Sequence, residues 1–395
     1  MEDLLSQEIE ILLSEDIDSV IKSQQGAFDE LAAPFEKSII IFGAGFAGIK
    51  ALNGLRQLKI EPLAFADNNQ RLWNQFIEGV PVLSPQEAAI KFGNTSVFVI
   101  TVHNSSRPKQ QLLDLNCKKV ISYAYLFAKY PKVFLPYFAL DLPYEIYKQS
   151  DDIQKAFSLF VDESSRREYL SQLRWRLFLD FDKLAYPITQ SMRDEEYFPL
   201  DIYMSLLNEI FVDCGAFDGD TIRRFLTQRE YLFDKIIGLE PDPFSFKKLQ
   251  TYVSTIPENF RNKVTLLQAA VGARQEKLKF QAMSSLGSGV SNTGTVEVDC
   301  VALDDVLNDC VPTLIKMDLE GFELSALTGA SQIIENASAV LAITIYHCQD
   351  HLWRIPLFIH SLSNDYHFFL KPHAEEFWDV SCYAVPVTRL NTKFK

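Results

Sequence analysis

The stretch that decides the fold is residues 209–221, which read EIFVDCGAFDGDT. An apolar run typical of a buried strand leads to Asp213 and into a turn that contains Gly215 and Gly219, and the following TIRRFL is typical of a helix. Glycine lets the backbone approach a ligand with no Cβ in the way. Ligands of open α/β sheets bind outside the carboxyl ends of the strands. The sequence therefore predicts a ligand-binding turn at the edge of a parallel sheet.

Further strand-like segments follow this turn in the C-terminal half. Apolar runs recur with helix-capable or loop segments between them, which is the pattern of an α/β domain. The runs are EIFVDCG, KIIGLEP, VTLLQAAVG, TLIKMDLEG and AVLAITIYH, and YHFFLKP and VSCYAVPV then have the length of a terminal antiparallel hairpin. We predict an α/β fold with a Rossmann-like sheet closed by that hairpin.

A second, smaller sheet is predicted near the N-terminus. Residues 38–48, SIIIFGAGFAG, form a short apolar run that ends in a glycine turn, and PLAFADN is the next strand candidate. Helical intervals with interrupting prolines fill the middle of the chain. We expect an N-terminal helix plus a Rossmann-like domain at 1–135, a helical connector that could serve as an acceptor lid at 136–205, and the main α/β domain at 206–395.

Composition indicates a soluble globular protein. Of its 395 residues 47% are hydrophobic, and no apolar stretch approaches the roughly 20 residues of a membrane helix. The acidic N-terminus lacks the features of a signal peptide, and the six cysteines form no C-x-x-C pair, so we expect a cytoplasmic location. Because a net charge of −14 repels polyanions, nucleic acid is a poor substrate.

Two acids at successive strand ends suggest the ligand of the main sheet. Asp213 would oppose a pyrophosphate but suits a ligand that carries an ammonium and a sulfonium, which favours S-adenosylmethionine over a dinucleotide. Glu240 ends KIIGLE one strand later, and a carboxylate there can accept from both hydroxyls of a ribose. The alternative is that both acids cap neighbouring helices.

Over roughly residues 162–386 the sequence resembles the FkbM-type methyltransferases, class I S-adenosylmethionine-dependent enzymes of which many methylate hydroxyl groups. The motifs that carry the resemblance are SSRREYLSQLRWRL, EEYF, VDCGAFDGDT, LEPDPFSFKKL, AAVG, LIKMDLEGFELSALTGA, AITIYH and LKPHAEEFW. The resemblance implies a class I methyltransferase fold in which the donor is held by Asp213, Gly215, Ala216 and Gly219 at its methionine part, Glu240 at the ribose, and Gln268 and Ala269 beside the adenine.

The acceptor side is expected where LIKMDLEGFE ends a strand at Asp318. Methyl transfer to a hydroxyl is an in-line displacement, so positioning supplies much of the catalysis and a base need only remove the hydroxyl proton. Asp318 and His347 are the two candidates for that role, and the sequence does not rank them. Glu320 and Glu323 either contribute directly or stabilise the N-terminus of the following helix.

Metal binding is not predicted. His347 and His351 form an H-x-x-x-H, but the pair straddles a strand end and no third ligand is evident, although Asp318 could hold a divalent cation. Lys371 and His373, in LKPHAEE, are candidate acceptor-binding residues. The resembling family usually carries a more basic, His-rich run there, so the sequence departs from it at this point.

The first domain has its own nucleotide fingerprint. Gly43, Gly45 and Gly48 fit G-x-G-x-x-G between a strand and a helix, and Asp67 follows about 20 residues on. Over 38–102 this region resembles the N-terminal domain of bacterial sugar O- and N-acyltransferases, which implies a sugar nucleotide as ligand. The alternatives are a degenerate fold used for dimerisation, as in a homo-oligomer, or for docking a partner.

Taken together, these features predict an S-adenosylmethionine-dependent methyltransferase that O-methylates a sugar, a glycan or a sugar-decorated metabolite. One alternative is an NAD-dependent sugar-modifying enzyme that uses the N-terminal domain. Another is a non-catalytic scaffold that keeps both folds for binding. The acids at Asp213, Glu240 and Asp318 count against the scaffold.

Overall fold

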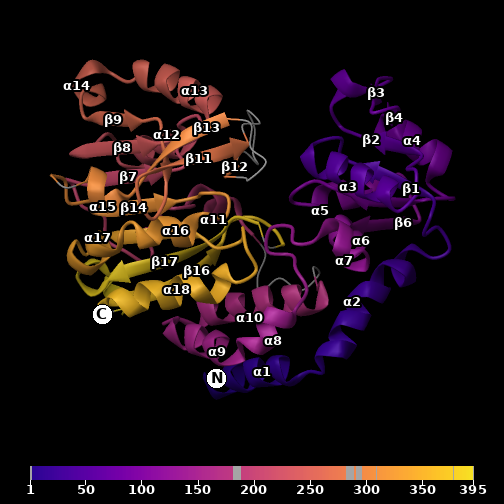
Figure 1. Ribbon diagram of the computed structural model, residues 1–395, viewed down its shortest axis with the longest axis horizontal. Coiled ribbons are helices and arrows are strands. Elements are labelled where there is room, and N and C mark those ends of the chain that lie inside the picture. The colour runs from indigo at the N-terminus through magenta and orange to yellow at the C-terminus, as the bar shows by residue number, and fades with distance from the viewer. Residues whose placement is uncertain are drawn as a thin grey trace. The chain divides into compact units, whose positions relative to one another are not determined.

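The computed structural model describes residues 2–180, 188–281, 289–290, 296–307, 309–376 and 378–394. The chain divides into two compact units, each containing its own mainly parallel sheet (Figure 1). The first unit comprises Met1–Ser150, Leu170–Tyr186 and Ala374–Trp378, and the second comprises Asp151–Tyr169, Pro187–His373 and Asp379–Lys395.

The first unit begins with two helices, α1 (Glu2–Ser14) and α2 (Ile17–Ala32), and continues into a sheet of order β3-β4-β2-β1-β5-β6. Its strands pair in parallel except β3 with β4, and the central strands are buried throughout. The strands are β1 (Ile39–Phe42), β2 (Ala64–Ala66), β3 (Phe76–Ile77), β4 (Val80–Leu83), β5 (Val97–Ile100) and β6 (Lys119–Ser122). Between and after them lie α3 (Phe46–Gln57), η1 (Gln70–Leu72), α4 (Pro85–Phe92), α5 (Ser106–Asp114), α6 (Tyr123–Lys129) and α7 (Pro131–Phe134).

Four of the described helices lie in the predicted connector. They are α8 (Tyr144–Lys148), α9 (Ser150–Leu159), α10 (Glu163–Phe178) and α11 (Gln190–Asp194). The boundary between the two units falls within α10, at Leu170, so the connector residues are shared between the units.

The second unit is built on a seven-stranded sheet of order β16-β17-β15-β14-β7-β8-β9. Its parallel strands are β7 (Ile210–Cys214), β8 (Lys235–Leu239), β9 (Val264–Leu267), β14 (Leu314–Met317) and β15 (Val340–Thr344). The antiparallel hairpin consists of β16 (Tyr366–Pro372) and β17 (Val380–Pro386) and pairs with β15 through β17. The prediction of a class I methyltransferase-like sheet closed by a terminal hairpin is confirmed.

Helices connect the strands of this unit, and short 3-10 turns follow the last one. The helices are α12 (Asp220–Gln228), α13 (Pro243–Ser254), α14 (Glu258–Arg261), α15 (Leu303–Val306), α16 (Glu323–Thr328), α17 (Ser331–Asn336) and α18 (His351–Leu362), and the turns are η2 (Val387–Arg389) and η3 (Thr392–Phe394). The cap of α13 explains where it begins, because Asp242 accepts the N–H groups of Phe244 and Ser245 and Pro243 follows at the first helical position.

A four-stranded accessory sheet, of order β10-β13-β11-β12, was not expected from the sequence. It contains β10 (Ala270–Val271), β11 (Glu276–Gln281), β12 (Gly289–Val290) and β13 (Val296–Val301). The run VTLLQAAVG, predicted as one strand, is therefore divided between two sheets. Alternating burial along β13 reflects its single packed face.

The register of the main sheet brings the ends of three strands to one edge. Asp213 of β7 is opposite Lys316 of β14 on one side and opposite Gly238 of β8 on the other. The residues that follow these strands, among them Gly215, Glu240 and Asp318, therefore lie at the carboxyl edge where open α/β sheets bind ligands. Among the described residues no helix is long and apolar enough to cross a membrane.

Candidate active site

The turn after β7 has the backbone that its glycines suggest. Gly215 has φ +80° and Gly219 has φ +90°, both in the left-handed region. A Cβ on Gly215 would lie 2.1 Å from the carbonyl oxygen of Asp318, and one on Gly219 would lie 2.6 Å from the ring of Tyr252. Only glycine fits at Gly215, because the turn after β7 touches the chain at the end of β14 there. Ala216, between the two glycines, is fully buried.

Asp213 is paired inside the protein. Its Oδ1 lies 3.1 Å from Nζ of Lys316, both side chains are buried, and Lys316 also donates to the carbonyl of Gly215 at 2.6 Å. Burial raises the pKa of Asp213 to about 6 against the opposing effect of Lys316. The partner that the structure gives to Asp213 is thus a lysine, which the strand-end argument did not anticipate.

Glu240 links the loops after β7 and β8 through hydrogen bonds. One carboxylate oxygen accepts the N–H of Phe217 at 2.9 Å and the other accepts the N–H of Asp242 at 2.8 Å. Burial raises the pKa of Glu240 to about 7. Each carboxylate oxygen has a second lone-pair site, so these bonds leave acceptor capacity for a ligand.

Gln268 and Ala269 follow β9 at the same edge. The N–H of Glu240 donates to the carbonyl of Leu267, which links the ends of β8 and β9. The side chain of Gln268 is exposed and that of Ala269 is buried. The structure therefore brings the predicted donor residues to neighbouring strand ends.

The other side of the turn carries a group of acids and imidazoles. Asp318 accepts from the hydroxyl of Tyr197 at 2.9 Å, and its other oxygen lies 3.4 Å from Nε2 of His347. Nδ1 of His347 is 2.7 Å from Oε1 of Glu323, a fully buried carboxylate that also accepts the N–H of Leu319. Glu323 therefore orients the ring of His347 toward Asp318.

Exposure separates the two candidates for the proton-accepting role. The side chain of Asp318 is 27% exposed and that of His347 is 1% exposed. Burial lowers the pKa of His347, but the nearby carboxylates of Glu323, Glu320 and Asp318 have the larger effect. Together they raise its pKa to about 10. Asp318, Glu323 and His347 also offer atoms that lie within 4.8 Å of one another, so they could hold a metal ion.

The other predicted acceptor-binding residues, Glu320 and Lys371, have different surroundings in the structure. Glu320 has φ +52° and reaches within 3.8 Å of Nε2 of His347, so it belongs to the Asp318 group. Lys371 forms an ion pair with Asp201 at 2.7 Å.

His373 is buried and supports the site indirectly. One ring nitrogen donates to the carbonyl of Met192 and the other accepts from the hydroxyl of Tyr383 at 2.7 Å, while that hydroxyl oxygen accepts the N–H of Tyr197. Burial lowers the pKa of His373 to about 4, consistent with a neutral ring. The chain of contacts therefore runs from His373 to Tyr197, the residue that holds Asp318.

Two further acids near Asp318 were missed by sequence reasoning. Burial, together with the neighbouring charges of Glu196 and Asp318, raises the pKa of Asp379 to about 7. Glu196 is itself paired with Arg224 at 2.8 Å. Glu196 precedes the sheet and Asp379 lies just before the last strand, so nothing in the local sequence linked them to Asp318.

The first unit has a comparable turn after β1. Gly43 has φ +104°, and Ala44 donates its N–H to the carboxylate of Asp67 at 2.7 Å. A Cβ on Gly48 would lie 2.0 Å from the carbonyl oxygen of Gly43, whereas one on Gly45 would meet no atom within 4 Å. The fingerprint residues thus come together at the carboxyl edge of the first sheet.

One solved structure has the same overall fold as this chain. The crystal structure of methyltransferase FkbM from Methylobacillus flagellatus KT matches with a TM-score of 0.73 and 20% identity, over 97% of this chain and 98% of that chain. A putative rRNA-methylase from Clostridium thermocellum matches with a TM-score of 0.32 and 10% identity, over 50% of this chain and 94% of that chain. A comparison with curated protein sequences gives no match.

The sheet order and the ligand edge define a class I methyltransferase-like α/β fold. Residues 213–371 match the family described as the methyltransferase FkbM domain. This match identifies residues 213–371 as a methyltransferase domain of the FkbM type.

Proposed function

We propose that the domain at 206–395 transfers a methyl group from S-adenosylmethionine to a hydroxyl oxygen of a sugar, a glycan or a sugar-decorated metabolite. The observation that carries this proposal is the contact between the predicted donor turn and Asp318. A Cβ on Gly215 would lie 2.1 Å from the backbone of Asp318, so residues suited to the donor and to the acceptor share one edge.

The residues at the donor side fit S-adenosylmethionine. When bound, this cofactor supplies an electrophilic methyl group on a positively charged sulfur. The glycine turn leaves room for close approach of a ligand to the backbone, and Glu240 keeps lone pairs that can accept ribose hydroxyls. Gln268 and Ala269 would border the adenine. Asp213 acts through Lys316, which fixes the carbonyl of Gly215 and so shapes the turn.

At the acceptor side Asp318 is the residue that contacts the substrate hydroxyl. Its partly exposed carboxylate is held by Tyr197 and lies beside His347, so it can accept the hydroxyl proton and fix the direction of the oxygen. His347, which is almost fully buried, is a positioning residue that acts on Asp318 and is itself held by Glu323.

The charges around Asp318 favour a neutral, hydroxyl-rich acceptor. Glu320 and Asp379 add carboxylates to its surroundings, which supply hydrogen-bond acceptors and repel anions. Lys371 is engaged by Asp201, so it stays a weaker candidate for acceptor binding.

The test uses the full-length chain. Isotope-labelled S-adenosylmethionine is incubated with a panel of nucleotide sugars and glycans, and the products are analysed by mass spectrometry for label on a hydroxyl oxygen. Titration calorimetry with S-adenosylmethionine, its demethylated product and NADH runs in parallel. Binding of NADH to a protein that binds neither sulfur compound would overturn the proposal and favour an NAD-dependent enzyme.

A second candidate function concerns the domain at 1–135. The bond from Ala44 to Asp67 and the positive φ of Gly43 form a turn suited to a nucleotide, and we propose a sugar nucleotide as its ligand. Calorimetry with UDP- and GDP-sugars measures this. Loss of the signal in Gly45→Glu, a position where a side chain meets no neighbour, would place the ligand at the turn, and a retained signal would contradict the proposal.

A further inference from the structure

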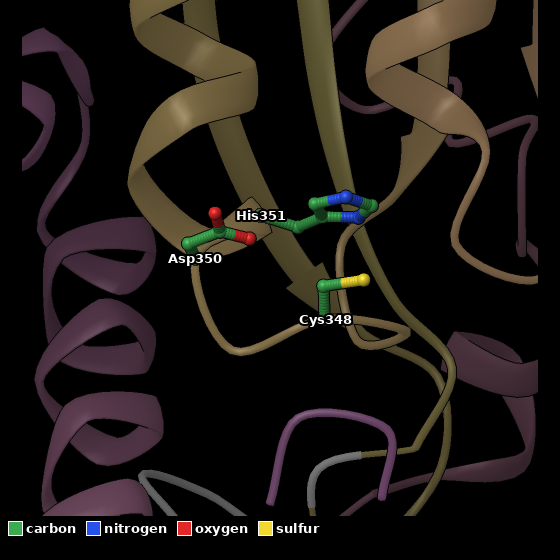
Figure 2. A group of neighbouring side chains, drawn as sticks. All are labelled: Cys348, Asp350 and His351. Atoms are coloured by element: carbon green, nitrogen blue, oxygen red, sulfur yellow. The ribbon is translucent and has the colours of Figure 1, made fainter. Parts of the chain in front are cut away.

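A cluster of three different metal-binding side chains lies just beyond β15. Cys348 and Asp350 are in the loop after that strand, and His351 is the first residue of α18. Each offers one ligand atom, and these atoms lie within 4.8 Å of one another. Figure 2 shows the sulfur of Cys348 directed toward the ring of His351. A thiol, a carboxylate and an imidazole therefore meet at one place.

A buried carboxylate, that of Glu323, lies beside the imidazole of this cluster. Oε2 of Glu323 lies 3.2 Å from Nδ1 of His351, and the two side chains are 0% and 3% exposed. These two atoms form an ion pair with each other, and within the described part of the chain neither has a further hydrogen-bond partner. Two buried atoms that both carry lone pairs need a positive charge close to them, and a cation or a proton can supply it.

We propose that Cys348, Asp350 and His351 bind a zinc ion, with Oε2 of Glu323 as the fourth ligand. Zinc takes thiolate, imidazole and carboxylate ligands in a tetrahedral arrangement, and the thiolate disfavours magnesium and calcium. Cys348 and Asp350 are only partly buried, which leaves their side chains room to turn toward an ion. One oxygen of Asp350 pairs with Arg354 at 2.7 Å, which leaves the other for the ion.

The ion has a structural role beside the acceptor site. Four protein ligands close its coordination shell, which is the pattern of a structural rather than a catalytic zinc. Glu323 binds it through Oε2 and holds His347 through Oε1 at 2.7 Å. The ion therefore fixes the carboxylate that orients His347 toward Asp318. Sequence reasoning did not identify this site, because it paired His351 with His347 rather than with Cys348 and Asp350.

The experiment measures metal directly, so it does not depend on methyl transfer. Full-length protein without a polyhistidine tag is stripped with a chelator, reloaded with zinc chloride and desalted, and its zinc content is determined by mass spectrometry. Calorimetry with zinc chloride gives the affinity. Cobalt chloride is a second probe, since a cobalt–thiolate bond produces a charge-transfer band.

We expect one zinc per chain and a cobalt–thiolate band in the parent protein. Cys348→Ser should remove the band and weaken zinc binding at least about tenfold, and Asp350→Asn should weaken it in the same direction. Cys310→Ser is the matched control, because Cys310 is also partly buried and lies outside the cluster, and it should keep both signals.

Three outcomes would overturn the site. They are a reloaded parent protein without zinc, a Cys348→Ser variant that binds zinc as tightly as the parent, and a Cys310→Ser variant that loses the band. Circular dichroism and binding of S-adenosylmethionine are measured on the same samples to verify folding. If the donor fails to bind while zinc binds through Cys348, the proposed function fails and the zinc site stands.

Discussion

The carboxyl edges of the two sheets are built alike and yet carry different chemistry. In each, a strand ends in a positive-φ glycine, Gly43 after β1 and Gly215 after β7, and an acid follows the neighbouring strand. Each acid accepts two backbone N–H groups. One comes from the glycine turn, and the other comes from the residue two positions after the acid. The bonds are Ala44 and Asn69 to Asp67 at 2.7 Å each, and Phe217 and Asp242 to Glu240 at 2.9 and 2.8 Å.

The third strand of each edge makes the difference. Thr101 follows β5 and donates its hydroxyl to the carbonyls of Phe42 and Gly43, whereas Asp318 follows β14 and lies beside His347. The shared geometry of turn and acid is therefore a property of the fold. The second edge carries a carboxylate beside an imidazole because an aspartate, rather than a threonine, comes directly after its third strand.

The largest expected effect comes from this third strand. Asp318→Ala should lower turnover by roughly 10²- to 10⁴-fold, because the acceptor hydroxyl loses the group that orients it and takes its proton. Thr101→Ala, at the corresponding place in the first sheet, should leave turnover unchanged. Steady-state kinetics with labelled donor and an acceptor identified by the panel measures both variants. Equal activity of Asp318→Ala and the parent would remove Asp318 from the site.

A smaller effect, on the affinity for S-adenosylmethionine, should distinguish Glu240 from Asp67. Glu240→Ala should weaken binding of S-adenosylmethionine at least tenfold, because hydrogen bonds to a charged group contribute roughly 1.5 to 3 kcal/mol each. Asp67→Ala should leave that affinity unchanged while removing the same kind of turn contact in the first sheet. Calorimetry on folded protein measures both. A donor affinity that responds to Asp67 and ignores Glu240 would reverse the assignment of the two edges.

The second edge also depends on a buried neutral histidine, which should appear in the pH dependence of stability. Burial lowers the folded-state pKa of His373 to about 4, below the value of about 6.5 for an unfolded chain. Its contribution to stability is therefore full above pH 6.5 and lost as the pH falls from about 6.5 to about 4.

Calorimetric melting temperatures across this window measure the effect. His373→Gln should lose less melting temperature on acidification than the parent protein. The control variant His360→Gln, on α18, should lose as much as the parent. If the melting temperature of His373→Gln falls on acidification as much as that of the parent, a neutral, buried ring at this position would be contradicted.

The smallest effects are expected from the exposed ion pairs of both units. Arg56→Met in the first unit removes a pair with Glu61, and Lys371→Met in the second removes a pair with Asp201. Each should change the free energy of unfolding by about 0 to 1 kcal/mol, because exposed charges are well solvated. Denaturant titration measures this. A large rise in the acceptor KM of Lys371→Met alone would assign that lysine to acceptor binding.

The fold class and the positions of the strand-end residues could be predicted from the amino-acid sequence alone. Apolar runs and glycine turns are local properties, so the ends of β7, β8 and β14, with Asp213, Glu240 and Asp318, could be located without knowing how the strands pair. Their common location followed from the general rule for parallel sheets.

The partners of these residues depend on tertiary packing. The pairing of Lys316 with Asp213 requires β14 to lie beside β7, and the approach of Asp379 and Glu196 to Asp318 requires distant segments to pack together. In the same way Glu323 lies between His347 and His351 only because α16, β15 and α18 meet. Strand order and burial are non-local properties, since they are set by the packing of the whole unit, and the pKa values and contacts that make a site depend on them.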